Sequence, residues 1–280
     1  QKTQDLKHLI NSNIERCVRK KEIQQRTMKE IENRDTYQLY GELLTANIYS
    51  IQKGMTSVTL PNYYSENMEE VTIPLDSELT PSENAQKYFK KYNKEKRTFA
   101  AMQEQIAAND EELEYLESVL TSVETCQDEQ DIKDIREELR NEGYIKRIKQ
   151  QKGMKSNKKS APMHFVSSDG FDIYVGKNNT QNDYLTLKFA NSSDLWFHTK
   201  NIHGSHTIIK LGLDKDVPKT TITEAAELAA YYSKGRDSSQ VPVDFTQIKN
   251  VKKPNGAKPG MVIYDYYNTI YVTPKELKNE

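Results

Sequence analysis

The sequence is poor in the residues that build disulfide scaffolds and membrane spans. Its 280 residues contain only two cysteines, Cys17 and Cys126, which lie far apart and form no CxxC pair. No apolar run approaches the roughly 18–20 residues that a membrane helix requires. We therefore expect no disulfide framework, thiolate metal site or membrane partner. The two thiols are interpreted as small core residues on helices, in a reducing, cytoplasmic compartment.

Neither sign of charge is in excess. The chain has 40 lysines and arginines against 41 aspartates and glutamates, so its formal net charge is -1. Such a chain has no global attraction to nucleic acid, and any basic surface must be local. Only 35% of the residues are apolar while 29% are charged, and the mean hydropathy is -0.86. This polar composition favours an elongated, solvent-exposed shape.

The beginning of the chain lacks the features of a secretion signal. The first ten residues, QKTQDLKHLI, contain no long apolar core, so no signal peptide is predicted. The chain starts with Gln rather than Met, which indicates a fragment of a longer protein whose upstream part holds further activity.

The clearest periodicity predicts a long helix at about residues 82–126. Apolar residues recur there in steps of three and four, as in a coiled-coil seam. The seam comprises Phe99, Met102, Ile106, Asn109, Leu113, Leu116, Leu120 and Val123. Asn109 is its one polar member, and a polar seam residue often sets the register. Ser82, just after Pro81, is the predicted N-cap.

A second helical stretch at residues 3–53 is the predicted partner. Its stripe consists of Leu6, Ile10, Ile14, Cys17, Met28 and Ile31, followed by Tyr40, Leu44, Ile48 and Ile51. Lys21 and Gln24 interrupt the stripe, and Gly54 is the predicted C′ residue. The two stretches predict a long antiparallel helical coiled-coil arm over residues 1–145, with a third helix at about 128–142 packing near its base.

A small β-containing insertion at about residues 54–81 is predicted to form the tip of the arm. Val58–Leu60 and Val71–Ile73 are its two short strand-like runs. Tyr63, Tyr64 and Met68 would give the tip a surface suited to docking on a protein. The simpler alternative is that the arm is only a spacer.

Residues 146–160 are predicted to be a flexible basic linker. Its basic residues are Lys146, Arg147, Lys149, Lys152, Lys155, Lys158 and Lys159, and no acidic residue lies among them. Such a density of positive charge can neutralise phosphates. A solvated linker without a ligand remains the alternative.

The sequence pattern of residues 161–280 predicts a compact α+β domain with a mainly antiparallel sheet. Strand-like runs are predicted at 164–167, 171–175, 184–189, 195–197, 207–210, 261–264 and 270–272. One alanine-rich helix is predicted at residues 223–234, with Thr223 as its N-cap and Gly235 as its stop. The fold class of the whole chain is therefore predicted as α+β.

Three segments of this domain carry the side chains suited to binding: GKNNTQND (176–183), DLWFHTKNIHGSH (194–206) and VKKPNGAKPG (251–260). The predicted RNA-binding residues are Lys177, Asn178, Asn179, Asn182, Asp194, Trp196, His198, Lys200, His203, His206, Lys252, Lys253 and Lys258. Asparagine amides suit base edges and 2′-hydroxyl groups, and lysines suit phosphates. Trp196 offers a stacking face if it is exposed, although a lone tryptophan between Leu195 and Phe197 also suits a core.

Other chemistries fit these segments less well. Residues 176–183 resemble a Gly-Lys turn whose backbone N–H groups could hold a phosphate, but the GxxxxGK[ST] spacing is missing, so nucleotide hydrolysis is not expected. His198, His203 and His206, with Asp194, raise the hypotheses of a metal site and of a histidine-based nuclease. Neither HExxH, a thiolate nor a second carboxylate cluster accompanies them. We therefore predict a binding protein rather than an enzyme, without metal or cofactor.

With these motifs the chain resembles the C-terminal half of the NFACT family, the bacterial RqcH and fibronectin-binding protein A-like group with eukaryotic relatives in ribosome-associated quality control. The resemblance covers nearly the whole chain. Residues 176–183 resemble the opening signature of the family's RNA-binding domain, NFACT-R, and 194–198 with 204–206 resemble its second signature. The family's helix and basic loop are matched by Ala225, Ala226, Ala229, Tyr231 and Ser233 and by residues 251–260. Upstream, residues 41–44, 84–92 and 137–144 resemble the coiled-coil and middle region.

The resemblance implies a role on the ribosome. Full-length relatives bind stalled large ribosomal subunits with tRNA attached and recruit alanyl-tRNA, so that untemplated alanine tails mark the nascent chain for degradation. The arm would reach toward the stalk base, and NFACT-R would contact tRNA or rRNA. Such proteins of streptococcal-type bacteria are also described as fibronectin-binding surface proteins without a signal peptide, so host attachment at the cell surface is the alternative.

The chain departs from the family in one respect. The family's N-terminal domain and helix-hairpin-helix segment are absent, and the Asp-Arg pair that the family uses for tRNA selection lies in that missing part. Alanine-tail synthesis by these residues alone is therefore not expected.

Overall fold

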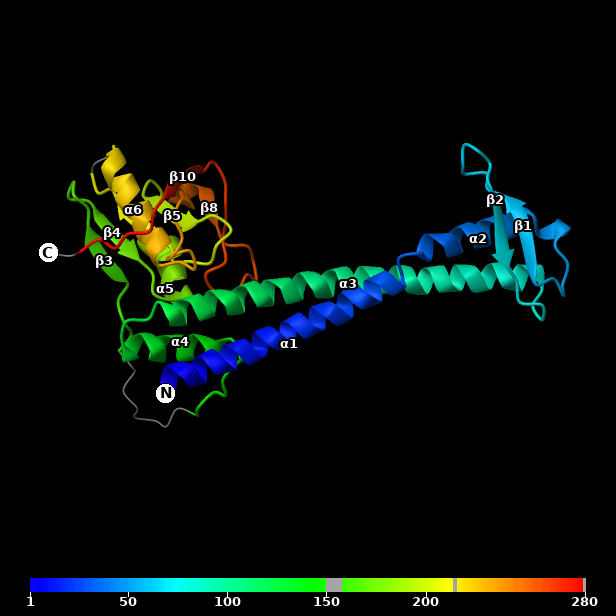
Figure 1. Cartoon of the computed structure of the whole chain (residues 1–280), viewed down its shortest axis with the longest axis horizontal. Coiled ribbons are helices and arrows are strands. Elements are labelled where there is room, and N and C mark those ends of the chain that lie inside the picture. Colours follow the sequence, from blue (N-terminus) through cyan, green and yellow to red (C-terminus); the bar gives the residue numbers. More distant parts are fainter. Residues whose placement is uncertain (150–157, 214–215, 279–280) are drawn as a thin grey trace. The chain divides into compact units, whose positions relative to one another are not determined.

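The computed structural model describes residues 1–149, 158–213 and 216–278. It combines long helices with antiparallel sheets (Figure 1). The chain divides into two compact units, which are residues 1–17 with 111–280, and residues 18–110. Most of the predicted basic linker, including Lys152 and Lys155, lies outside the described residues. Within the described ranges, no helix is both long and apolar enough to cross a membrane.

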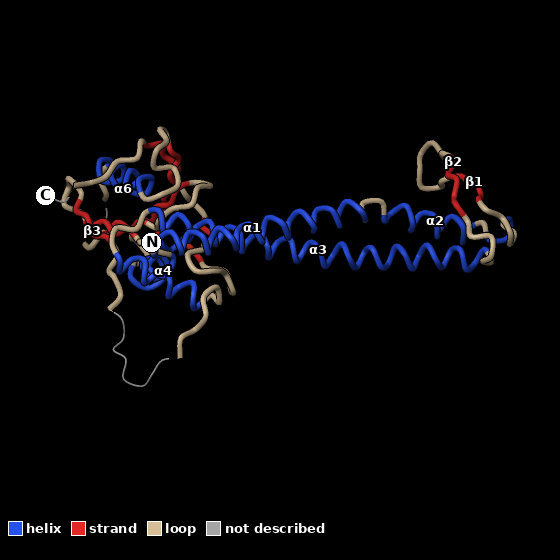
Figure 2. Tube along the Cα trace, turned by 60° about the horizontal axis from the view of Figure 1, so that its bottom comes forward, coloured by secondary structure: helices blue, strands red, loops and turns tan. Residues whose placement is uncertain are grey.

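Three helices and one hairpin form the unit of residues 18–110. The helices are α1 (Lys2–Glu30), α2 (Arg34–Ala46) and α3 (Pro81–Glu124), of which α1 and α3 continue into the other unit. The α2 helix lies alongside the N-terminal part of α3 in both views (Figure 1, Figure 2). The contacts run Lys21 to Asp110, Arg34 to Phe99 and Tyr37 to Tyr88. Since one set of numbers rises while the other falls, the helices pair antiparallel here.

The helix predicted over residues 3–53 is not continuous. A turn at residues 31–33 separates α1 from α2, and a short 3-10 helix, η1 (Ile48–Ser50), follows α2. The prediction of Gly54 as the C′ residue is wrong, because α2 already ends at Ala46 and Gly54 takes its positive φ of 100° in a later turn. Gly41 lies inside α2, where a Cβ would come within 2.8 Å of the Phe89 ring, so the missing side chain allows α2 and α3 to approach closely.

The N-terminus of α3 is capped two residues earlier than predicted. The helix begins at Pro81, and the backbone N–H of Glu83 donates to the Thr80 hydroxyl at 3.1 Å. The same hydroxyl donates to the Glu83 carboxylate at 3.0 Å. Thr80 is therefore the N-cap in place of Ser82, and Pro81 occupies the first helical position, where its missing N–H costs nothing.

The predicted β-containing insertion is confirmed as a hairpin of β1 (Ser57–Pro61) and β2 (Glu70–Pro74). Val58 pairs with Ile73, and Leu60 pairs with Val71, in antiparallel register. Leu60 and Ile73 are buried with Leu43 and Leu44 of α2. The apolar face of the hairpin therefore covers α2, while its loop leaves Tyr63, Tyr64 and Met68 exposed.

In the other unit, the ends of α1 and α3 pack with the predicted third helix, α4 (Glu129–Asn141). The Asp128 carboxylate caps α4 by accepting the backbone N–H of Asp131 at 3.0 Å, and Gly143 ends it with a φ of 86°. Apolar residues of the three helices form one cluster, including Leu6, Ile10, Leu116, Val119, Ile135 and Leu139. The local capping signals and the apolar stripe of α4 therefore agree with the tertiary packing.

The compact domain is built on a six-stranded antiparallel sheet in the order β10-β7-β5-β6-β4-β3. Its strands are β3 (Met163–Val166), β4 (Asp172–Val175), β5 (Leu195–Thr199), β6 (Thr207–Lys210), β7 (Val241–Gln247) and β10 (Asn268–Val272). The α6 helix (Lys219–Tyr231) covers one face, and its alanines pack on Phe197 and Val243 (Figure 1). On the opposite face, a second cluster gathers Leu185, Trp196, Ile208 and Val251.

Two predictions for this domain are wrong, and one strand was not predicted. Residues 184–189 are helical rather than a strand: they lie in α5 (Asn179–Tyr184) and a π-helical turn, η2 (Leu185–Phe189). Thr223 is not an N-cap, because α6 begins at Lys219 and the Thr223 hydroxyl donates back to the Lys219 carbonyl inside the helix. The β7 strand was not predicted, although it contacts both β5 and β10.

Candidate nucleic-acid interface

The GKNNTQND segment folds into a closed turn rather than a phosphate cradle. Asn178 caps α5 by accepting the backbone N–H of Gln181 at 2.8 Å. The N–H of Lys177 donates to the Gln181 side chain at 2.9 Å, and that of Gly176 donates to the carbonyl of His206 at 3.1 Å. A Cβ on Gly176 would lie 2.0 Å from the Asn182 side-chain oxygen. Since these amides have protein partners, the interpretation of the segment as a phosphate-binding turn does not hold.

Instead, the segment attaches the domain to α3 and α4. The Asn179 side-chain amide donates to the Ser118 hydroxyl at 2.9 Å, and the backbone N–H of Thr180 donates to Glu138 at 3.0 Å. The Tyr115 hydroxyl donates to the same Glu138 carboxylate at 2.8 Å. Glu138 is only 3% exposed, and burial raises its pKa above the usual value even though these hydrogen bonds oppose the shift.

Further polar contacts extend this attachment, which we call the docking seam. The pairs are Lys177 with Asp131 (3.3 Å), Ser160 with Asp134 (2.9 Å), His203 with Glu117 (3.1 Å) and Lys258 with Glu142 (3.6 Å). Sequence reasoning missed the acidic members of the seam. The one available signal was Glu138, which lies three residues after Ile135 on the apolar stripe of α4.

Of two predicted histidines inside the domain, His206 is buried and His198 is partly buried. The His206 Nε2 donates to the Gly260 carbonyl at 3.1 Å, so its Nδ1 accepts from the Thr186 hydroxyl at 2.7 Å. Burial lowers the pKa of His206 to about 3, and burial also lowers the pKa of His198. Both rings pack against Trp196. The rings are therefore neutral at pH 7, and no cluster of three or more metal-ligating side chains occurs among the described residues.

Several other predicted RNA-binding residues hold the fold together. Asp194 accepts the backbone N–H groups of Asn191 and Leu211 and pairs with Lys210 at 2.9 Å. Lys253 contacts both Asp183 oxygens and donates to a backbone carbonyl. Trp196 is fully buried (0% exposed), so the condition for stacking on a base is not met. Asn178, Asn179 and Asn182 are also buried. In this structure these side chains position the interface and present little or no surface to RNA.

The exposed part of the domain next to these residues is aromatic and basic. The Lys200 ammonium lies 5.2 Å from the centre of the Tyr267 ring. Tyr267 is 43% exposed and packs edge-on against Tyr264, which in turn contacts Trp196. Lys252 is exposed on the short strand β8 (Val251–Lys252), where its neighbour Val251 pairs with Tyr264. Through Tyr264, the buried Trp196 thus supports an exposed tyrosine beside a lysine, a combination suited to RNA bases and phosphates.

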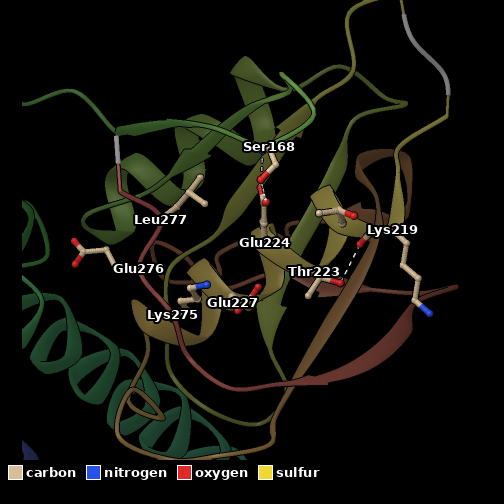
Figure 3. Close-up of a pocket in the computed structure, with 9 residues that line it drawn as sticks. Ser168, Lys219, Thr223, Glu224, Glu227, Lys275, Glu276 and Leu277 are labelled. Carbon is tan, nitrogen blue, oxygen red and sulfur yellow. Dashed lines mark hydrogen bonds between the residues drawn. The ribbon is translucent and has the colours of Figure 1, made fainter. Parts of the chain in front are cut away.

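A pocket on another side of the domain has a different character. It is lined by Ser168, Lys219, Glu224, Glu227 and Lys275, with Glu276 and Leu277 at its rim (Figure 3). Glu224 accepts the backbone N–H of Ser168 at 2.9 Å, and burial raises the pKa of Glu227. Three carboxylates against two lysines make this pocket unsuited to phosphate groups.

Comparisons with known proteins agree with these features. Residues 1–159 match the NFACT N-terminal and middle domains, and residues 161–265 match the NFACT protein RNA binding domain. The chain belongs to the NFACT family. It is 46% identical over 276 residues to the Rqc2 homolog RqcH of Bacillus subtilis and 41% identical over 280 residues to that of Streptococcus suis. These alignments cover 98% and 99% of this chain.

The NFACT chain described here spans about half the length of these relatives, because the alignments cover 48% and 49% of them. A solved structure with a similar fold is the C-terminal part of the fibronectin/fibrinogen-binding protein from Streptococcus suis. It is 35% identical, has a TM-score of 0.78, and the match covers 99% of this chain and 95% of that one. Shorter similarity, 29% identity over 75 residues, links the chain to the human ribosome quality control complex subunit NEMF.

Proposed function

We propose that this NFACT chain is the binding module of a cytoplasmic ribosome-associated quality-control factor. In this proposal the compact domain contacts tRNA or rRNA of the large ribosomal subunit and thereby supports alanine tailing of stalled nascent chains. The names of the RqcH relatives and of the RNA-binding domain support the assignment. The residues provide surfaces for binding rather than turnover, so we assign the module no enzyme activity of its own.

The observation that carries this proposal is the contact between Lys200 and Tyr267. An exposed tyrosine offers a π face to an unpaired base, and the adjacent ammonium offers a charge to its phosphate. The Tyr267 ring packs against Tyr264 at a centroid distance of 5.2 Å, and Tyr264 in turn packs against Trp196 at 4.7 Å. Because the platform is supported by packed aromatic rings, little side-chain entropy would be lost on binding.

The helices have a second role in the proposal. We propose that α1, α2 and α3 together form the coiled-coil arm, and that the β1-β2 hairpin docks on a protein of the ribosomal stalk base. The exposed side chains of Tyr63, Tyr64 and Met68 in the hairpin loop support this role. The loop offers aromatic and sulfur-containing surface of the kind enriched at protein interfaces.

The proposal is tested by binding the chain to purified large ribosomal subunits at about 0.05 and 0.2 M salt. The affinity should fall steeply as salt rises, because each phosphate contact releases counterions. Lys252→Glu and Lys200→Glu should each weaken binding and reduce the slope of log affinity against log salt by roughly 0.7–0.9 per lost phosphate contact.

The matched control is Lys234→Glu, which changes an exposed lysine in the turn after α6. It should bind like the unchanged chain. Binding that is insensitive to salt, or equal losses for Lys234→Glu and Lys252→Glu, would argue against an RNA interface at Lys200 and Tyr267.

A second candidate function is binding of host fibronectin at the cell surface. The observation that favours it is the solved structure of the fibronectin/fibrinogen-binding protein, which has a similar fold. Within the part of the chain that the structure describes, the edge strands β3 and β10 each pair on one side only, so an extended fibronectin segment could add to either edge. Immobilised fibronectin and labelled RNA tested side by side, with mutual competition, distinguish the two functions.

A further inference from the structure

A cavity of about 480 Å³ lies where the end of β7 meets the beginning of β10. The residues that matter here are Phe245, Gln247, Lys249, Asn250, Tyr266 and Asn268. They come from β7, from the 3-10 helix η3 (Ile248–Asn250) and from the turn before β10. The lining combines two aromatic rings, three carboxamides and one lysine, and it contains no carboxylate.

The carboxamides provide hydrogen-bonding groups that the fold does not use. Within the described residues, the side chains of Gln247 and Asn268 make no hydrogen bond, and both lie at the cavity. Asn250 donates its side-chain amide to the Thr246 hydroxyl at 3.0 Å, and this bond fixes the orientation of the whole carboxamide, including its oxygen. A carboxamide presents a donor and an acceptor side by side, the pattern found on the edges of nucleobases.

Tyr266 is held in an unusual backbone conformation that exposes its ring. Its φ is 51°, in the left-handed region that bulky residues rarely adopt. The Thr246 hydroxyl lies 3.1 Å from the carbonyl oxygens of both Asp265 and Tyr266 and stabilises the turn. The tyrosine is 86% exposed. Backbone strain of this kind is often found at sites that contact ligands.

We propose that this cavity binds one unstacked base of a single-stranded RNA segment. The base would stack on Tyr266, its edge would face the carboxamides of Gln247, Asn250 and Asn268, and Lys249 would contact a neighbouring phosphate. The volume lies within the roughly 300–1,000 Å³ of small-ligand pockets. The inference rests on the proposed RNA-binding function and specifies single-stranded RNA, because a base paired in a duplex could not enter the cavity.

The test measures binding of the chain to three labelled oligonucleotides of equal length. These are a single-stranded RNA, an abasic ribose-phosphate strand and an RNA duplex. We expect the single strand to bind roughly tenfold or more tightly than the abasic strand, since one stacked base contributes a change of about that size. Tyr266→Ala should remove most of that difference, while Tyr266→Phe, which keeps the ring, should retain it.

Two controls keep the result interpretable. Tyr49→Ala removes another highly exposed tyrosine from η1, in the other unit, and should bind like the unchanged chain. Thermal melting checks that Tyr266→Ala is folded, and Asn268→Ala tests the cavity without touching the strained turn. Asn268→Ala should lower the affinity for the single strand but not for the abasic strand.

The failure of this inference differs from the failure of the proposed function. If salt-sensitive RNA binding persists but the abasic strand binds as tightly as the base-containing strand, the base site is wrong and the RNA-binding function stands. The same conclusion follows if Tyr266→Ala and Asn268→Ala both bind normally. If no strand binds at low salt, the proposed function and the base site fail together.

Discussion

The Glu138 carboxylate on α4 accepts the backbone N–H of Thr180 on α5, with 3.0 Å between Oε1 and N. Its other oxygen accepts the Tyr115 hydroxyl of α3 at 2.8 Å. One buried side chain therefore links two helices to the RNA-binding domain. Removing such a carboxylate leaves buried donors unpaired, which costs more than the bonds themselves contribute.

Glu138→Ala is expected to lower the free energy of unfolding by about 2–4 kcal/mol, because the donors of Tyr115 and Thr180 lose their acceptor. Chemical denaturation measures the change. The matched control is Glu137→Ala, which removes a half-exposed carboxylate paired with Arg140 on the same helix and should cost less than about 1 kcal/mol. Equal losses for the two variants would contradict the role of Glu138 in the docking seam.

We also expect Glu138 to make the stability of the folded chain depend on pH. Because burial raises its pKa in the folded state above the ordinary value of 4.5, the folded chain holds this proton more tightly than the unfolded chain. Its contribution to stability is therefore complete below pH 4.5 and is lost as the pH rises through the folded-state pKa. Melting temperatures measured from pH 4 upward should show this loss, and Glu138→Gln should lack it. A loss of the same size in the variant would assign the dependence to other groups.

We expect the opposite pH dependence from His206. Burial lowers its pKa from the usual 6.5 to about 3, so the folded chain holds this proton less tightly than the unfolded chain. The stability due to the neutral ring is present above pH 6.5 and is lost as the pH falls toward 3, by up to about 1.4 kcal/mol per pH unit. His206→Gln should flatten this part of the curve, as measured by denaturation at several pH values. An unchanged slope would show that the ring accepts its proton without unfolding.

Gly260 is predicted to tolerate no side chain. It has a φ of 78°, and a Cβ there would lie 2.2 Å from the Asn179 side-chain oxygen. Gly256 has nearly the same φ, 75°, with nothing within 4 Å. Both Gly→Ala changes incur the backbone strain. Gly260→Ala should lower the free energy of unfolding by a further 1–3 kcal/mol (about the usual cost of overpacking). Thermal melting of the two variants measures the difference, and equal melting temperatures would contradict the close packing at Asn179.

Lys252 and Lys253 are adjacent in the sequence but should respond differently to charge reversal. Lys253→Glu places a carboxylate beside Asp183 and should lower the free energy of unfolding by about 1–3 kcal/mol, because the half-buried pair at 3.1 Å is replaced by repulsion. Lys252→Glu changes an exposed side chain and should leave stability within about 0.5 kcal/mol. Denaturation of both variants checks this. A Lys253→Glu variant as stable as the unchanged chain would show that Lys253 is not needed for the fold and is available for RNA binding.

Features that depend on residues close together in the sequence could be predicted from the sequence. The β1-β2 hairpin, the α4 helix with its end at Gly143, and most strands of the sheet follow from local propensity, periodicity and turn residues. The N-terminus of α3 was placed correctly to within one turn, although the capping residue is Thr80. The antiparallel sheet under one helix was also predicted, because the alternation of apolar and polar residues in the strands is a local pattern.

The prediction failed where distant contacts override local preference. Residues 184–189 have the composition of a strand, but Asn178 caps a helix there and Leu185 is buried against Trp196. The β7 strand was missed because it contains Pro242 and Asp244, two residues disfavoured in strands. Asp244 is accommodated because the hydroxyls of Tyr264 and Thr269 donate to its carboxylate.

The sequence by itself determined the membership of the chain in the NFACT family, its α+β class and the segments that carry its polar side chains. Only the tertiary structure decided which of those side chains are available. Asn179, His206 and Lys253 are drawn inward because their partners on α3, α5 and the basic loop satisfy them, whereas Tyr266 and Tyr267 remain exposed. The physical reason is that a polar group is buried only where another part of the chain supplies its hydrogen bonds, and a sequence pattern does not reveal that partner.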